Sequence, residues 1–139
     1  MIHFAGLSKA PEIAYTNQIS QKADIWAFGL MVYILFNNKC PIDYYHANEI
    51  MEEYRSNTEL NTKLDRVIKA CVQYEPSDRP TMKEIVQFLN DEIEYFGYEF
   101  IEMERLENER VKKERLEEEQ RKKVERRQKH RNRFFCGLC

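Results

Sequence analysis

Glycine is scarce in this chain of 139 residues, and its four glycines stand far apart, at positions 6, 29, 97 and 137. A loop that holds phosphate groups through backbone N–H groups needs glycines close together. The sequence therefore excludes a phosphate-binding loop of this kind, and we expect no cofactor-binding residues in the chain.

Long apolar runs and dense cysteines are also missing. The longest apolar run, residues 25–36, is shorter than the roughly 20 residues that a membrane-spanning helix needs, so it predicts a buried helix. No signal-peptide pattern opens the sequence. The four cysteines form neither a secreted disulfide framework nor a four-ligand zinc spacing. We expect a cytoplasmic protein.

Side chains that carry covalent or metal chemistry do not cluster in the sequence. The three histidines lie in unrelated segments, and neither Cys40 nor Cys71 has a local His or Asn to orient it. A cysteine nucleophile therefore has little support. We predict no catalytic residue and no metal ligand.

Charge is distributed unevenly along the chain. Through residue 100 there are nine basic and fifteen acidic residues, and from residue 101 there are thirteen basic and nine acidic ones. Most of the basic excess lies in residues 121–133, where eight Lys and Arg residues face one acid, Glu125. This basic block requires an explanation separate from that of the body.

Hydrophobic periodicity predicts helices and no strand alternation. After the 25–36 helix, apolar stripes predict helices that contain 50–54, 64–72 and 82–93, and Thr81 with Glu84 forms a capping-box pattern before the last of these. Its expected buried face carries Met82, Ile85, Val86, Leu89 and Ile93. The expected fold is mainly α, with a helical lobe at 1–96, a charged single helix at 97–133 and a cysteine-containing tail at 134–139.

The charged segment has its own helix signals. Acids precede bases by four residues in five pairs, an arrangement that supports a solvated helix by about 0.2–0.5 kcal/mol per pair; the pairs are Glu109–Lys113, Glu117–Arg121, Glu118–Lys122, Glu119–Lys123 and Glu125–Lys129. An apolar seam that starts at Ile93 is broken by Glu107 and Arg110. The pattern therefore favours a free helix over a coiled coil.

Three short strings follow one another in a fixed order. They are Ala10-Pro11-Glu12, the six residues Asp24 to Gly29 (DIWAFG), and Asp78-Arg79-Pro80. In order and separation they resemble the second half of a eukaryotic protein kinase domain, over about residues 4–95. The resemblance implies the helical C-terminal lobe of that fold, from the end of the activation segment to the last helix.

The resemblance also implies structural roles for the motif residues. It pairs Glu12 with Arg79 in a buried ion pair, and gives Asp24 hydrogen bonds from the backbone of the catalytic loop. Trp26 is then expected to fill space under the activation segment, and Gly29 to permit close helix packing. Ala5 stands where the family usually has a Ser or Thr, and Ser8 stands where it usually has an aromatic residue, which places substrate recognition in doubt.

Only nine residues precede Ala10, so the glycine-rich loop, strand lysine, HRD and DFG motifs of the family have no place in the chain. We expect no enzyme activity from this chain alone, although a complete family member uses ATP and Mg²⁺. One hypothesis is a partial domain of a Ser/Thr-type protein kinase, whose partner is the missing N-lobe. The other is a non-catalytic interaction module of kinase origin, which binds a protein partner.

The C-terminal residues suggest a membrane attachment. Cys136 stands four residues from the end, as in a C-a-a-X prenylation signal, although Gly137 is not aliphatic and Cys139 is an unusual last residue. The 121–133 block is suited to an anionic membrane on its cytoplasmic face. Nucleic acid would attract the same charges, and a solvated helix end is the simplest alternative. We expect the membrane rather than nucleic acid.

Overall fold

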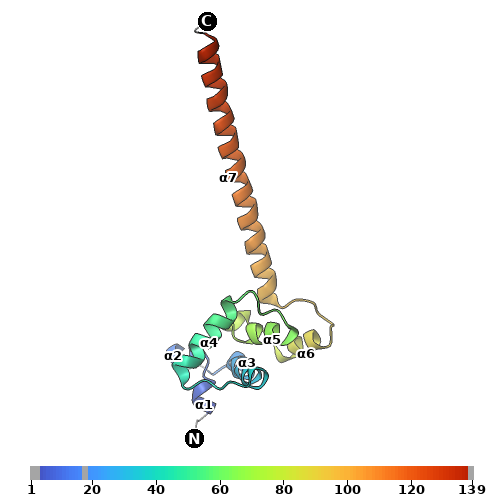
Figure 1. Ribbon diagram of the computed structural model, residues 1–139. Helices are drawn as coiled ribbons and strands as arrows, with labels where there is room; N and C mark the ends of the chain where they lie inside the picture. Colours follow the sequence, from blue (N-terminus) through green and yellow to red (C-terminus); the bar gives the residue numbers. More distant parts are fainter. Residues whose placement is uncertain (1–3, 17–18, 138–139) are drawn as a thin grey trace. The chain divides into compact units, whose positions relative to one another are not determined.

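The computed structural model describes residues 4–16 and 19–137, and the chain divides into two units, Met1–Phe100 and Ile101–Cys139. No strand occurs in the described ranges, so the mainly α fold class is confirmed. Figure 1 labels the α-helices along the chain, which are α1 (Phe4–Leu7), α2 (Pro11–Thr16), α3 (Gln21–Asn37), α4 (Tyr44–Ser56), α5 (Lys63–Cys71), α6 (Met82–Leu89) and α7 (Gly97–Cys136). A short 3-10 helix, η1 (Pro76–Asp78), lies between α5 and α6 in the sequence.

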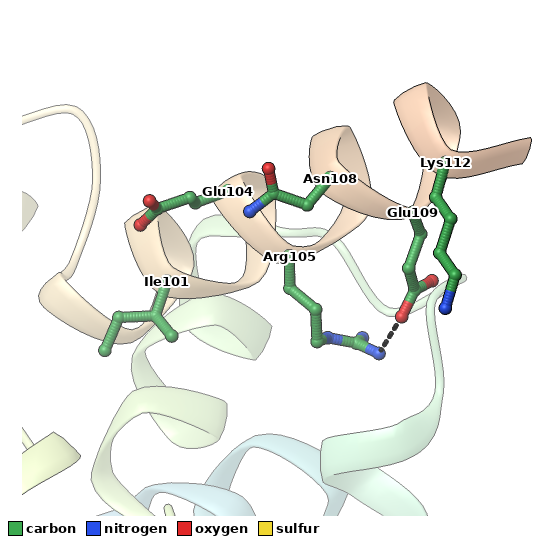
Figure 2. Close-up of a pocket in the computed structure, with 6 residues that line it drawn as sticks. All are labelled: Ile101, Glu104, Arg105, Asn108, Glu109 and Lys112. Carbon is green, nitrogen blue, oxygen red and sulfur yellow. Dashed lines mark hydrogen bonds and ion pairs between the residues drawn. The ribbon is translucent and has the colours of Figure 1, made fainter. Parts of the chain in front are cut away.

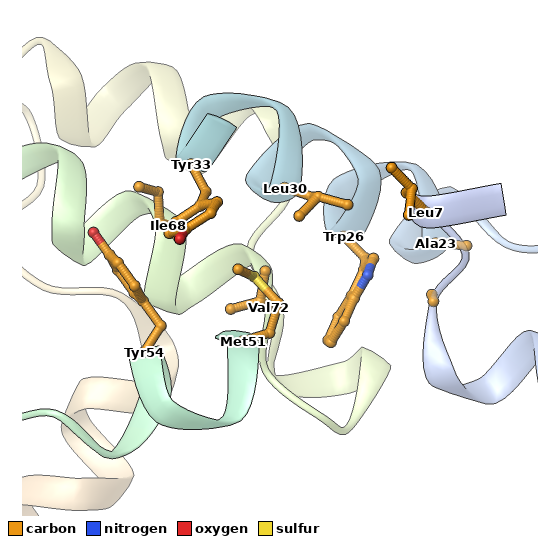
Figure 3. Packing of buried hydrophobic residues seen from close by; sticks show 10 residues of the cluster. Leu7, Ala23, Trp26, Leu30, Tyr33, Met51, Tyr54, Ile68 and Val72 are labelled. Atoms are coloured by element: carbon orange, nitrogen blue, oxygen red, sulfur yellow. The ribbon is translucent and has the colours of Figure 1, made fainter. Parts of the chain in front are cut away.

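Helix α3 is the central helix of the first unit. It ends at Asn37 because Asn38 adopts a left-handed conformation, with φ of 51°, and Pro41 follows. One side of α3 packs against α4, α5 and the residue after α5, and Figure 3 shows this cluster at close range. Its large members are Trp26, Leu30, Tyr33, Met51, Tyr54, Ile68 and Val72.

A second cluster lies on the adjoining side of α3. Ile25 packs there with residues of α5, α6 and the loop before α7, which are Val67, Ala70, Cys71, Ile85, Phe88 and Phe96. The rings of Phe88 and Phe96 lie 4.4 Å apart, centroid to centroid. Together the two clusters enclose α5 more completely than α3.

Gly29 allows α3 and α5 to approach each other closely. A Cβ atom at this position would lie 2.5 Å from Cys71 Cβ and 3.1 Å from Val72 Cγ1. Non-bonded carbon atoms do not approach each other to the shorter distance, so any side chain would force the helices apart. The structure thus supplies the contact for which the motif glycine was expected.

The sequence predicts α3 as a buried helix, and the structure buries it only in part. Met31 is 39%, Phe36 46% and Leu35 74% exposed, whereas Leu30 is completely buried. The two clusters cover adjoining sides of α3, so Met31 and Leu35 on the remaining side contact water, and Phe36 is exposed near the end of the helix. An all-round apolar sequence predicts full burial only when a domain supplies cover on every side.

The buried face of α6 also differs from its prediction. Met82, Val86 and Leu89 are 41–49% exposed, and Ile93 lies beyond the helix and is half-buried. Ile85 and Phe88 are the buried pair. The helix ends at Leu89, so it is too short to contain the apolar stripe that the sequence predicts over residues 82–93.

Capping explains where two of the helices begin. Thr81 and Glu84 form the predicted box at α6, with the Thr81 N–H donating to Glu84 Oε2 at 2.6 Å. Thr62 and Asp65 form a second box at α5, which the sequence analysis missed. Asp65 is buried and also accepts a hydrogen bond from the Tyr54 hydroxyl.

Helix α7 begins at Gly97 and continues to Cys136, three residues beyond the predicted end, because Phe134 and Phe135 extend it before Gly137. Of the five predicted acid–base pairs, Glu118–Lys122 is present, at 2.6 Å. The other ion pairs along the described part of α7 use Arg105, Arg110 and Lys113 with different acids. Arg110, which is expected to break an apolar seam, pairs with both Glu107 and Glu114.

Because the two sides of α3 differ in burial, the same Leu→Ala substitution should cost much more stability on one side than on the other. Leu30→Ala removes a fully buried side chain and should lower the free energy of unfolding by about 2–5 kcal/mol. Leu35→Ala, in the same helix but 74% exposed, should change it by less than about 0.5 kcal/mol. Urea unfolding of both variants checks this, and a large loss for Leu35→Ala would show that its side of α3 is covered.

Candidate functional site

Glu12 and Arg79 form a two-point ion pair between α2 and the turn before α6. Arg79 Nη1 lies 2.7 Å from Glu12 Oε1, and Arg79 Nη2 lies 2.8 Å from Glu12 Oε2. The Arg79 side chain is completely buried, and 17% of the Glu12 side chain is exposed. The pair that the kinase resemblance implied is therefore present in the structure.

Backbone carbonyls occupy the remaining donors of Arg79. Its Nε donates to Gln73 O at 2.7 Å, and its Nη atoms also donate to Tyr74 O and Lys22 O, both at 3.0 Å. A buried guanidinium is tolerated only when its donors are satisfied. Arg79 thus fixes the end of α5, the start of α3 and the segment after Ala10 to one point.

Trp26 packs directly against this ion pair. The centre of the Arg79 guanidinium lies 5.1 Å from the indole centroid, and that of Arg55 lies 5.8 Å from it. Such contacts contribute about 0.5–2 kcal/mol, more when they are withdrawn from water, and Trp26 is 2% exposed. Ala10 and Pro11 are buried as well.

Burial and pairing act in opposite directions on the acidic member. Burial alone would raise the pKa of Glu12, but hydrogen bonds from Arg79 and from the Glu12 backbone, with the charge of Arg79, bring it below the ordinary 4.5. Burial raises the pKa of Cys71 to about 12. Cys71 is therefore a neutral thiol at physiological pH, and its role is packing against Gly29 rather than nucleophilic chemistry.

The side of α3 that lacks cover carries one continuous stripe. Asp24, Phe28, Met31 and Leu35 follow the i, i+4, i+7, i+11 spacing that places residues on one side of a helix. Asp24, Met31 and Leu35 are exposed, Phe28 is half-buried, and no residue in the described ranges pairs with the Asp24 carboxylate. We call these four residues the α3 stripe.

The remaining candidates do not assemble into a chemical site. His46 accepts a hydrogen bond from Ile42 N at the start of α4, His130 lies on α7, and His3 lies outside the described residues, as does Cys139. Cys40 and Cys136 are exposed free thiols in different elements. Within the described ranges no group of three His, Cys, Asp or Glu residues converges on a metal position.

A hollow along α7 does not provide an enclosed ligand site either. Figure 2 shows the side chains that line it, all of which come from α7: Ile101, Glu104, Arg105, Asn108, Glu109 and Lys112. Arg105 and Glu109 form an ion pair at 3.1 Å. Enclosed small-molecule sites are concave and bury most of the ligand surface. The side of a single helix cannot do this.

Sequence reasoning missed a second ion pair, which is half-buried. Arg66 of α5 binds Glu99 at 2.7 and 2.9 Å and donates to Glu94 O, and it lies over the rings of Phe88 and Tyr95. The hydrogen bond that Arg66 donates to Glu99 raises the pKa of Arg66, and burial opposes it with a smaller effect. In the sequence Arg66 is only one of several basic residues of α5, on the side away from its apolar stripe, and such a residue is common on any helix.

Comparison with known proteins places this geometry in context. A family model described as protein tyrosine and serine/threonine kinase matches residues 8–89. A probable leucine-rich repeat receptor-like protein kinase of Arabidopsis thaliana is 31% identical over 58% of this chain and 9% of its own length. A probable serine/threonine-protein kinase of Dictyostelium discoideum is 32% identical over 59% of this chain and 7% of its own length.

A tyrosine kinase receptor of Drosophila melanogaster is 30% identical over 68% of this chain and 13% of its own length. The chain thus spans only a small part of the relatives that it matches. No solved structure matches it. Among the described helices, none is long and apolar enough to cross a membrane.

The lowered pKa of Glu12 predicts a specific dependence of stability on pH. The ion pair should stabilise the fold fully above about pH 4.5, and this contribution should disappear as pH falls through the lower pKa of the folded state. The difference in unfolding free energy between the wild type and Glu12→Gln should therefore shrink below that pH. Urea titrations from neutral to acidic pH measure it.

The exposed carboxylate Glu102 provides the control, because Glu102→Gln should follow the wild type at every pH. A difference for Glu12→Gln that stays constant down to acidic pH would contradict the account of the pair.

Proposed function

The chain belongs to the protein tyrosine and serine/threonine kinase family, and from that premise we propose that it forms the helical C-terminal part of a Ser/Thr-type protein kinase domain. In this role it is a scaffold. The activity of the whole domain is ATP-dependent protein phosphorylation in signalling, and the ATP- and Mg²⁺-binding groups come from a kinase segment outside this chain.

The α3 stripe is the observation that carries the proposal. An exposed apolar face on a central helix is unusual for a finished domain and indicates a surface that something covers. Asp24 stands at the start of that face, next to three apolar residues. In the kinase resemblance this aspartate receives hydrogen bonds from the backbone of the catalytic loop, so a segment with that loop fits both the charge and the apolar surface.

The chemistry of phosphoryl transfer supports a division of labour. Transfer depends on a lysine at the phosphates, carboxylates on Mg²⁺ and a base near the acceptor hydroxyl. Here Arg79 instead contacts both Glu12 and Trp26. Asp24 is the one acidic residue of the α3 stripe. The residues available here hold a lobe together and leave the reacting groups to the covering segment.

The Ser/Thr assignment rests on relatives as well as on pattern. The Dictyostelium relative is named a serine/threonine-protein kinase, although the Drosophila relative is a tyrosine kinase receptor. A second function is supported by the same stripe. If a protein ligand other than a kinase segment covers Met31 and Leu35, the chain acts as a non-catalytic interaction module of kinase origin.

Exposure of the purified chain to Mg·ATP tests the scaffold role. A ligand at a hundred times its dissociation constant would stabilise the fold by about 2.7 kcal/mol, which is several degrees in melting temperature. We expect the thermal unfolding of this chain to be unchanged by millimolar Mg·ATP relative to Mg²⁺ alone. A dose-dependent rise in melting temperature would overturn the proposal that the nucleotide site lies outside the chain.

A further inference from the structure

Helix α7 has two electrostatic regions. Between Arg105 and Lys122 the basic side chains alternate with acids, and Arg105, Arg110, Lys113 and Lys122 each form an ion pair with a neighbour one turn away. From 123 to 133 six basic residues meet a single acid, and none of those bases has an ion-pair partner among the described residues. We call residues 123–136 the basic end of α7.

The charges of the basic end are concentrated on one side of the helix. At about 100° per residue, Lys123, Arg127, His130 and Phe134 form one stripe, because they are spaced four, three and four residues apart. Arg126, Arg131 and Arg133 flank this stripe. The lone acid and two amide side chains lie toward the other side, at Glu125, Gln128 and Asn132, with Lys129 at the edge of that side. All of these side chains are exposed.

Two aromatic rings stand at the last turn. Phe134 and Phe135 are each 67% exposed, and one turn of helix separates Phe134 from His130 in the middle of the basic stripe. Phe135 lies about 100° away from Phe134, toward the amide side. The basic stripe therefore ends in one exposed ring, an arrangement in which the bases contact anionic head groups and the ring enters the boundary with the acyl chains.

We propose that the basic end of α7 binds the surface of a membrane that carries anionic phospholipids. This inference does not depend on the proposed kinase role. Charge complementarity supports it, because each basic residue near an anionic surface strengthens binding about fivefold. Single-stranded nucleic acid is a weaker match, because single strands bind in grooves lined by several stacking rings, and residues 101–136 belong to one continuous helix.

The binding is peripheral and reversible. The apolar residues of the basic end do not form a continuous face, since Val124 stands apart from Phe134 by ten residues and lies on another side of the helix. Insertion along the helix is therefore not favoured. Electrostatic attraction between the bases and the anionic lipids should therefore supply most of the binding, and binding should weaken as salt screens the charges. Lipidation at Cys136, which stays a prediction, would add a second anchor but is not needed for this contact.

Flotation of the purified, unmodified full chain with vesicles tests the inference. We expect binding to phosphatidylcholine vesicles that contain phosphatidylserine, at least tenfold weaker binding to phosphatidylcholine alone, and loss of binding at high salt. The triple variant Lys123→Gln, Arg127→Gln, Arg131→Gln should lower the partition to the anionic vesicles about a hundredfold.

A matched triple variant on the same helix is the control. Arg105→Gln, Arg110→Gln, Lys113→Gln removes the same net charge from bases that are already paired and should lower the partition less than about fivefold. Circular dichroism verifies that both variants keep their helix. Phe134→Ser should weaken binding more than Phe135→Ser, because only the first ring lies on the basic stripe.

Three results would overturn the inference. These are equal binding to neutral and anionic vesicles, equal losses in the two triple variants, and retention of a short RNA duplex or single strand under conditions where the chain ignores anionic vesicles. The last outcome would assign the basic end to nucleic acid instead.

Discussion

The ion pair between Glu12 and Arg79 joins positions 67 residues apart in the chain, and the arrangement of the first unit depends on it. The Arg79 guanidinium is held by one carboxylate and three backbone carbonyls, and Trp26 packs on it. An unpaired guanidinium in that position would be an uncompensated buried charge. The ion pair therefore fixes three segments to one another: the first residues of the lobe, the central helix and the turn before α6. Loss of the pair should loosen all three.

Patterns that combine local chemistry with a family motif were predictable from the sequence. The capping box at Thr81 and the end of α3 at Asn38 follow from backbone chemistry over a few residues. The Glu12–Arg79 pair followed from the resemblance, since nothing local links two residues so far apart. The exposure of Val86 was not predictable, because periodicity identifies apolar faces but does not reveal whether a neighbouring segment covers them.

The partial cover of α3 connects the fold to the proposed function. The same helix is buried on the side that carries Trp26 and Leu30 and exposed on the side that carries Asp24 and Leu35. A lobe built in this way is stabilised from within by the motif residues and still presents the surface on which the proposed function depends. The Arg66–Glu99 pair adds a second tie, between α5 and the first turn of α7, and extends the same lobe to Phe100.

A double-mutant cycle on the central ion pair tests this account most directly. Glu12→Gln, Arg79→Met and the double variant are compared with the wild type by urea unfolding at neutral pH. We predict that each single substitution lowers the unfolding free energy by about 3–5 kcal/mol, and that Glu12→Gln costs almost nothing once Arg79 is absent. Additive losses, or single losses below about 1 kcal/mol as for an exposed pair, would contradict the claim that this interaction holds the lobe together.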